Sequence, residues 1–558
     1  MKSAGGLRWT LLACSVAVSS ALVLGAFNPA PHSGGDNSTY VSLAYGLLTT
    51  GSYTEVFDPA GLPHTKYPPV FPMILAALIG LGARTWVALK STAVVSTVAA
   101  VGLGYLWAER RLGPWPAFAV AILLGSSSAV VYYSHWVLSD PVFLALTVAS
   151  FWAIEGGVAD GARRAWWLAG GVVLAGLAYF TRSAGLPLVV AIFAWLALER
   201  RWRALAVSAV ALGVPALAWW MRGRGAPASY GAEFWLIDPY QPTLGTLGVF
   251  DLVPRAVSNL VGYVTRHGPA GVVGGGGGAV AALGIALTVA ALYGWVRTVR
   301  ERVGPAELFL PLYAGLILVW PVVWSGDRFA LPLYPLVFLY GVVALRDLAG
   351  RVPRLLGALL MVAAMLTILV PAGGAWARAA TESRACARVA RAEGAFACYG
   401  PGVGAFVEAA AWASQALPEG ASVMTRKPSH FYVLSGLPSR TFPFDPDSDA
   451  QLAAADALGA EYVLIDEWDG QARRFVGPAV VRRPGAFCFV RAFGQPGAGG
   501  AQLLGILPVA ERSDARPGPN EEVRIPMCPP RYASEAGDGY SSSTSLSGAV
   551  PLLDGLDP

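Results

Sequence analysis

Residues 9–27, WTLLACSVAVSSALVLGAF, form an apolar run of 19 residues without a charged side chain. A run of this length is what an α-helix needs to cross the apolar core of a bilayer. The same character extends along the 558-residue chain, in which 55% of the residues are hydrophobic and only 13% are charged. Such a composition is too apolar for a single soluble core and predicts a mainly α-helical, polytopic membrane protein.

Ten further apolar runs indicate about eleven membrane spans, which we place as a helix bundle with additional interfacial helices. The later runs are residues 86–108, 115–133, 141–158, 166–181, 185–198, 204–221, 273–296, 306–323, 329–345 and 355–373. A shorter run, residues 69–83, contains Pro72 and is predicted to be an interfacial or re-entrant helix. Residues 222–272 are predicted to be a long loop.

Basic residues fix the expected orientation of these spans. They cluster at 110–111, 163–164, 200–203, 297–302 and 346–354, each time after an even-numbered span. Because cytoplasmic loops carry an excess of Lys and Arg, the N-terminus is expected in the cytoplasm and the C-terminal region outside it. The net charge of +5 is spread over these loops, so nucleic-acid binding is excluded. The first span is expected to remain as an anchor, although Lys2 and Arg8 before it leave a signal peptide as the alternative.

The composition changes after residue 373. Charged, Pro-rich and Gly-rich sequence follows, with strand-like pieces at 462–465 and 487–490 and a strand followed by a helix at 422–434. We therefore expect a membrane domain at 1–373, an extracytoplasmic soluble α/β domain at 374–535, and a Ser-rich and Gly-rich disordered tail at 536–558.

Four of the five cysteines lie in the predicted extracytoplasmic region: Cys386, Cys398, Cys488 and Cys528. An even number in an oxidising compartment favours disulfides. Three pairings exist, and proximity in the sequence favours 386 with 398 and 488 with 528. Four reduced thiols are the alternative. A zinc site is less favoured because no CxxC spacing occurs.

Polar residues from separate parts of the chain are expected at the same outer membrane face. They include Asp36 in Gly34-Gly35-Asp36-Asn37, Asp140 before Pro141, and the basic residues Lys66, Arg182 and Arg328. A carboxylate can take the proton of a hydroxyl acceptor, and cations can stabilise a phosphate that leaves a lipid-linked donor. This combination suits transfer of a sugar from a polyprenyl-phosphate donor. The alternatives are a helix cap for Asp36 or Asp140 and interfacial anchors for the basic residues.

The segments around these residues resemble a known family. They are Asp36-Asn37-Ser38-Thr39-Tyr40, Lys66-Tyr67-Pro68-Pro69-Val70-Phe71-Pro72, Ser139-Asp140-Pro141, Thr181-Arg182-Ser183-Ala184-Gly185-Leu186-Pro187 and Asp327-Arg328-Phe329-Ala330-Leu331-Pro332-Leu333-Tyr334-Pro335. Their order and spacing resemble bacterial GT-C membrane glycosyltransferases of the protein mannosyltransferase and aminoarabinose transferase type, over residues 9–373 and more weakly beyond.

That resemblance implies a role for each residue. Asp36 would be a catalytic acid of the first outer loop and Asp140 a second acidic residue near it. Lys66, Arg182 and Arg328 would contact the phosphate of the donor. The family often has a second acid directly after the first, whereas this chain has Asn37.

The remaining expectations concern substrates and alternatives. Tyr40 and His64 are candidate substrate contacts, although His64 and His135 are also typical of solvated loop residues. We expect no metal and no cofactor. The resulting hypothesis is an inverting glycosyltransferase at the outer face of the cytoplasmic membrane, whose partners are the bilayer, a polyprenyl-phosphate sugar and an acceptor hydroxyl of a protein, glycan or lipid. The rival hypotheses are a transporter or flippase of a lipid-linked or anionic substrate and a non-catalytic sensor.

Overall fold

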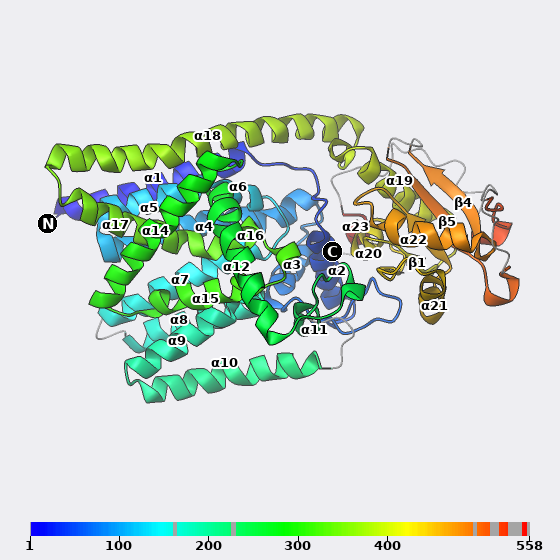
Figure 1. Ribbon diagram of the computed structural model, residues 1–558, viewed down its shortest axis with the longest axis horizontal. Helices are drawn as coiled ribbons and strands as arrows, with labels where there is room; N and C mark the ends of the chain where they lie inside the picture. The colour runs from blue at the N-terminus through cyan, green and yellow to red at the C-terminus, as the bar shows by residue number, and fades with distance from the viewer. Residues whose placement is uncertain are drawn as a thin grey trace.

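The computed structural model describes residues 2–159, 164–224, 230–494, 499–513, 524–533 and 550–554. It is mainly helical, with a helical part at one end and a small sheet covered by helices at the other (Figure 1). The helices of the first part, apart from single turns, are α1 (Lys2–Gly25), α2 (Gly35–Thr49), α3 (Val70–Gly80), α4 (Trp86–Leu112), α5 (Pro114–Ser126), α6 (Ser128–Tyr133), α7 (Asp140–Ala159), α8 (Arg164–Thr181), α9 (Leu186–Leu198), α10 (Trp202–Arg222), α11 (Tyr230–Phe234), α12 (Leu252–Gly262), α13 (Gly268–Val273), α14 (Gly278–Glu301), α15 (Pro305–Leu318), α16 (Asp327–Ala330), α17 (Tyr334–Ala349) and α18 (Arg354–Glu393).

Several of these helices have the length and composition of membrane spans. Within the described residues, six helical segments are long and apolar enough to cross a bilayer, and they include α1, α4, α10, α14 and α18. Five shorter apolar helices accompany them, among them α3 in the run predicted to be interfacial. The chain is therefore a multi-pass membrane protein, and the count of eleven spans remains a prediction.

The prediction of a long loop at 222–272 is wrong over its second half. Residues 252–273 are helical, forming α12, one π-helical turn at Tyr263–His267, and α13. Polar residues interrupt the apolar pattern there, so the sequence did not suggest a helix. The structure gives them internal partners. Arg255 donates to the carbonyls of Phe234 and Leu236, and the Asn259 amide donates to two carbonyls at the C-terminal end of α15 and just after it.

Helix α18 connects the two parts of the molecule. It is 40 residues long and runs from the end of the helical part that is farthest from the sheet to the sheet itself (Figure 1). Residue 373, after which we expected the α/β domain to begin, lies inside this helix. The change of composition therefore marks a point along a continuous helix and not a break in the backbone.

The α/β part contains the expected layered sheet. Its five strands are β1 (Val423–Met424), β2 (Ser439–Arg440), β3 (Tyr462–Ile465), β4 (Phe487–Phe493) and β5 (Ala501–Ile506), in the order β2-β1-β3-β5-β4. Strand β1 pairs in parallel with β2 and β3, while β5 pairs antiparallel with β3 and β4.

Side chains alternate between the two faces of this sheet, as the pleat of a strand requires. Val423 and Tyr462 pack in the core with α19 (Pro401–Ala416) and α20 (Pro428–Ser435). Their neighbours Met424 and Val463 pack on the opposite face, in the core with α21 (Ser448–Leu458) and α22 (Gln471–Arg482).

The cysteines pair as proximity suggested. Disulfides join Cys386 to Cys398 and Cys488 to Cys528, and Cys14 is free and exposed in α1. Most of the tail predicted to be disordered lies outside the described residues. Residues 550–554 are an exception, because they include the short helix α23 (Pro551–Asp554), with Val550 and Leu553 fully buried against the first helices of the chain.

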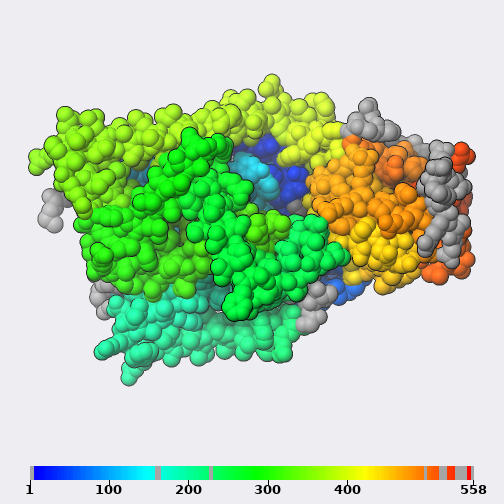
Figure 2. Space-filling view, in the orientation of Figure 1, coloured from blue at the N-terminus to red at the C-terminus, as the bar shows by residue number. Residues whose placement is uncertain are grey.

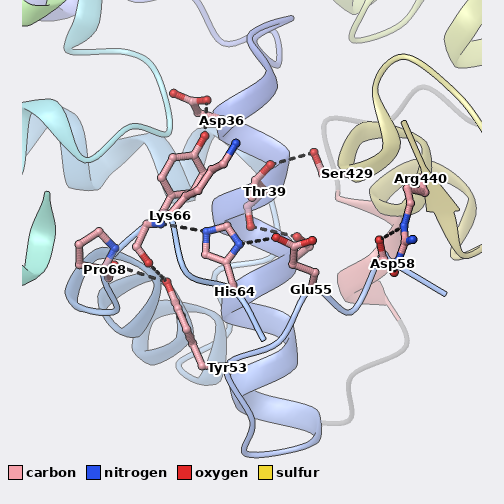
Figure 3. A network of polar contacts seen from close by, with 12 residues as sticks. Asp36, Thr39, Tyr53, Glu55, Asp58, His64, Lys66, Pro68, Ser429 and Arg440 are labelled. Carbon is pink, nitrogen blue, oxygen red and sulfur yellow. Dashed lines mark hydrogen bonds and ion pairs between the residues drawn. The ribbon is translucent and has the colours of Figure 1, made fainter. Parts of the chain in front are cut away.

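The α/β part is held against the segment between α1 and α4 (Figure 3). Arg440 at the end of β2 forms a two-point ion pair with Asp58, and the Thr39 hydroxyl of α2 donates to Ser429 of α20 at 2.9 Å. Figure 2 shows the two parts in contact along this border, with N-terminal residues in blue at the bottom of a hollow beside it. The first loop is thereby fixed between the helices and the sheet.

Candidate active site

A cavity of about 930 Å³ lies where the helical part meets the α/β part. Its walls come from α2, the loop before α3, the α8–α9 connection, the region of α11, the segment around α16 and the β1–α20 loop. Asp36, Tyr40, Lys66, Arg182 and Arg328 all line it. The structure thus brings together five of the seven predicted site residues, which the sequence separates by up to about 290 positions.

Asp36 occupies the first turn of α2, where a carboxylate interacts favourably with the helix dipole. Its two oxygens have different partners: Oδ1 accepts from the Tyr67 hydroxyl at 2.8 Å and Oδ2 from Arg328 Nη1 at 2.6 Å. Gly34 occupies the cap position, so Asp36 does not cap the helix. Burial alone would raise the pKa of the Asp36 carboxyl, but the adjacent Arg328 and the Tyr67 hydrogen bond lower it below its ordinary value.

Asp140 supports the arginines and does not line the cavity. Its side chain is 4% exposed at the start of α7. One oxygen, Oδ2, receives Arg182 Nη1 at 2.6 Å, Arg328 Nε at 2.9 Å and Arg328 Nη2 at 2.8 Å. Asp140 therefore lies behind both guanidinium groups. In the structure the Asp140 carboxylate contacts Arg182 and Arg328, and the catalytic role expected for it stays a prediction.

Arg328 is the central cation of the site. Its guanidinium contacts Asp36 on one side and Asp140 on the other, so a single rigid fork fixes two carboxylates from different helices. Arg182 reaches Asp140 and also donates to the Ser139 hydroxyl at 3.3 Å. Both arginines remain partly open to the cavity, where an anion could replace part of their present contacts.

Lys66 lines the cavity but is paired in this structure. Its Nζ lies 2.5 Å from Glu233 Oε1 on α11, a carboxylate the sequence analysis did not single out. Tyr67, the residue after Lys66, was also missed as a functional residue although it belongs to the quoted Lys66–Pro72 segment. The hydrogen bond of Tyr67 to Asp36 explains how that segment reaches the site.

The two candidate substrate contacts differ. Tyr40 faces the cavity one turn after Asp36, and its hydroxyl shares a 2.8 Å hydrogen bond with Ser139. His64 is only 2% exposed and does not line the cavity. Its Nδ1 bonds Glu55 at 2.8 Å and its Nε2 accepts from the Tyr67 amide. The interpretation of His64 as a solvated loop residue is wrong, because the ring is buried and both its nitrogens bond within the first loop (Figure 3). A substrate contact of His64 stays a prediction.

Asn37, at the position where the family often has a second acid, forms hydrogen bonds that a carboxylate could not all make. Its side chain is buried, with Oδ1 accepting from the Val137 amide at 2.8 Å and Nδ2 donating to the Gly34 carbonyl at 3.0 Å. These contacts join the start of α2 to the segment before α7. An amide can make both bonds, whereas an ionised carboxylate cannot donate the second.

The α/β part adds two cations that sequence reasoning did not select. Arg426 and Lys427 follow β1 directly and line the same cavity, and both lie near Asp469. Burial, together with the charge of Arg426, lowers the pKa of Lys427 below its ordinary value. The sequence does place this basic pair shortly after a predicted strand. Ligands often bind at the carboxyl edge of parallel strands, so this position indicates a binding site.

No group of three or more His, Cys, Asp or Glu side chains is arranged to hold a metal within the part of the chain that the structure describes. The polar groups that line the cavity include carboxylates, cations, tyrosines, other hydroxyl groups and His430. Such a set can bind an anion and accept a proton from a hydroxyl group at neighbouring positions.

The fold is that of GT-C membrane glycosyltransferases. An oligosaccharyltransferase from Archaeoglobus fulgidus in its apo form aligns with a TM-score of 0.56 at 13% identity, covering 87% of this chain and 73% of that chain. ArnT from Cupriavidus metallidurans bound to undecaprenyl phosphate aligns with a TM-score of 0.52 at 12% identity, covering 88% and 97% respectively. At such identities the likeness establishes the fold.

Sequence comparison agrees over part of the chain. Residues 66–221 match the family model of dolichyl-phosphate-mannose-protein mannosyltransferases. No curated protein sequence gives a match. The resemblance to GT-C glycosyltransferases predicted from the sequence is confirmed.

Proposed function

We propose that the protein transfers a sugar from a polyprenyl-phosphate donor to the hydroxyl group of an acceptor. The observation that carries this proposal is the contact of Arg328 with both Asp36 and Asp140 at a cavity large enough for a sugar and its phosphate. Two relatives in fold support the choice of donor. One is described in complex with dolichol-phosphate and the other with undecaprenyl phosphate.

In the proposed reaction Asp36 accepts the proton of the acceptor hydroxyl while the hydroxyl oxygen attacks the anomeric carbon. The bond from that carbon to the phosphate oxygen breaks, and the polyprenyl phosphate leaves with an additional negative charge. Arg182 and Arg328 would bind this developing charge more strongly than the donor's single charge, which lowers the barrier. Direct attack on the face opposite the leaving group inverts the anomeric centre.

Arg328 would couple the two ends of this reaction. In the structure its charge lowers the pKa of Asp36, which makes that carboxylate a weaker base. When the donor phosphate contacts Arg328, it takes over part of the interaction of Arg328 with Asp36. Asp36 then becomes more basic only with donor in place. Asp140 would hold Arg328 and Arg182 in position throughout.

We also propose that the cavity opens on the outer side of the cytoplasmic membrane, with the α/β part outside the cytoplasm and the N-terminus inside. Two disulfides in and beside the α/β part fit an oxidising compartment. The arginine-rich connections at the opposite end of the helical part fit the cytoplasmic side. On this proposal residues 1–373 would provide the catalytic membrane domain.

The test is transfer by purified protein from a polyprenyl-phosphate sugar, comparing wild type with Asp36→Asn. Loss of the base should lower turnover by about 100-fold or more while binding of the polyprenyl phosphate persists. Asp327→Asn is the matched control, because Asp327 also lines the cavity but bonds the Tyr133 hydroxyl and is not assigned a catalytic role. Near-normal transfer by Asp36→Asn would refute the mechanism. Movement of the lipid across vesicles without any transfer would indicate a transporter.

A further inference from the structure

A second cavity lies at the end of the helical part opposite the α/β part. It has a volume of about 610 Å³ and is formed where α4, α14 and α17 end, at the side where α18 begins (Figure 1). Six arginines from three separate connections line it: Arg110, Arg111, Arg297, Arg302, Arg346 and Arg351. Among the residues that the structure describes, two carboxylates line the same cavity, Glu301 and Asp347. None of these residues belongs to the candidate active site.

The inner wall of this cavity is rigidly built. Arg111 has a side chain only 4% exposed, and it pairs with both Glu155 and Glu307. Glu307 is itself held by the Tyr340 hydroxyl at 2.7 Å. The inner wall therefore keeps its shape whether or not a ligand is present.

The outer wall carries arginines that are open to a ligand. Arg297 and Arg351 share Asp347, whereas Arg302 is 53% exposed and lies 3.6 Å from Glu155. Arg346 donates to the Leu112 carbonyl, and no carboxylate of the described residues lies within ion-pair distance of it. Helix C-termini attract arginines. The lining carboxylates Glu301 and Asp347, counted together with Glu155 and Glu307, are two fewer than the six arginines. Helix C-termini do not require this excess of positive charge.

The surroundings place the cavity at the level of lipid headgroups. Trp115, Trp166 and Trp202 are 61%, 83% and 62% exposed in the first turns of α5, α8 and α10 at this end of the molecule. Exposed tryptophans mark the boundary between acyl chains and headgroups. On the apolar side of that boundary, α14 and α18 expose leucines such as Leu292 and Leu359, which acyl chains would cover.

We propose that this cavity binds the phosphate headgroup of an anionic glycerophospholipid, with Arg302 and Arg346 as its main contacts. The excess of two arginines is sufficient to neutralise the single negative charge of a phosphodiester, and guanidinium groups bind phosphate oxygens in pairs. The exposed apolar helices beside the cavity favour a lipid over a free phosphate ion. This site is independent of the proposed glycosyl transfer.

The experiment uses purified full-length protein in neutral detergent, titrated with phosphatidylglycerol or with phosphatidylcholine of the same chains, and counts retained lipid by native mass spectrometry. Wild type should retain phosphatidylglycerol and release phosphatidylcholine. In the Arg302→Ala/Arg346→Ala variant, phosphatidylglycerol binding should weaken about 25-fold, since each arginine near an anionic headgroup strengthens binding about fivefold. These substitutions leave the ion pairs of Arg111 and Asp347 intact.

The matched control is Arg200→Ala/Arg203→Ala, which removes the same charge from the α9–α10 connection at the same end of the molecule, outside the cavity. It should bind phosphatidylglycerol like wild type. Equal weakening in both variants, or none in either, overturns the proposal. Inorganic phosphate that displaces the lipid at comparable concentration would overturn the choice of a lipid. If the alanine variant does not fold, the glutamine pair Arg302→Gln/Arg346→Gln replaces it, with the same expected loss.

Discussion

Asp140→Asn separates a positioning role for this carboxylate from a catalytic one. In the structure, a single oxygen of Asp140 accepts a hydrogen bond from Arg328 Nε and lies within ion-pair distance of Arg328 Nη2 and Arg182 Nη1, and the side chain is almost completely buried. An asparagine keeps the shape and one acceptor oxygen but removes the charge that both guanidinium groups face. We therefore expect the free protein to lose about 3 kcal/mol of stability, at the low end for breaking a buried ion pair because Arg328 keeps Asp36 as a partner.

The same substitution should alter activity without removing the base. Misplacement of Arg182 and Arg328 is expected to lower turnover by about 100-fold, a typical cost of a shift of about 1 Å in a catalytic group. The charge of Arg328 would be directed more strongly at Asp36, so the pKa of Asp36 would fall further. The acid limb of the pH–rate profile should then move to lower pH in Asp140→Asn.

The assays are thermal unfolding with and without undecaprenyl phosphate, and the pH dependence of transfer. Because Arg182 and Arg328 both lose the charge of Asp140 in the variant, the lipid phosphate should stabilise Asp140→Asn more than it stabilises wild type. Ser139→Ala is the control, since it removes a neutral partner of Arg182 and Tyr40 but no charge, and its effect on stability and on the pH profile should be smaller. Wild-type stability together with wild-type turnover in Asp140→Asn would refute the reasoning, as would a loss of activity without any change in stability.

Three other outcomes are expected. Burial lowers the pKa of both His135 and His430 from 6.5 to about 3, and the charge of Lys90 or Lys427 adds to this effect. Between these pH values the unfolded chain therefore binds more protons than the folded protein. Stability should then fall by up to about 1.4 kcal/mol per pH unit for each histidine as the pH decreases below 6.5. Denaturant titrations from pH 7 to pH 4 measure this, and a His430→Gln variant whose pH dependence equals that of wild type would contradict it. Replacing the pair Cys488 and Cys528 by serine should cost about 4 kcal/mol in the chain-entropy model, measured by denaturation, and an unchanged midpoint would argue against it. A cytoplasm-dependent reporter fused just after α18 should be silent, and its activity would reverse the proposed orientation.

The sequence alone determined most of the long apolar helices and several of the charged groups that line the cavity. Apolar runs of spanning length and basic clusters are local features, and residues such as Asp36 and Arg328 stood out because charges are rare in so apolar a chain. The Cys386–Cys398 pair was also predictable, since 12 residues separate its members. The helix at 252–273 was not, because Arg255 and Asn259 make this segment too polar for a membrane span and find their partners only in distant segments.

Only the tertiary structure decided the roles of the charged residues. The sequence predicts Asp36 as the first catalytic carboxylate and Asp140 as a second one near it, yet only Asp36 faces the cavity and Asp140 lies behind two arginines. His64 was a candidate substrate contact, and in the structure both its ring nitrogens form hydrogen bonds within the first loop. Arg426 lines the cavity because the sheet packs against the first loop. The physical reason is that the strength of a charge depends on its burial and on neighbours within a few ångströms, and in this chain those neighbours come from segments far apart in the sequence.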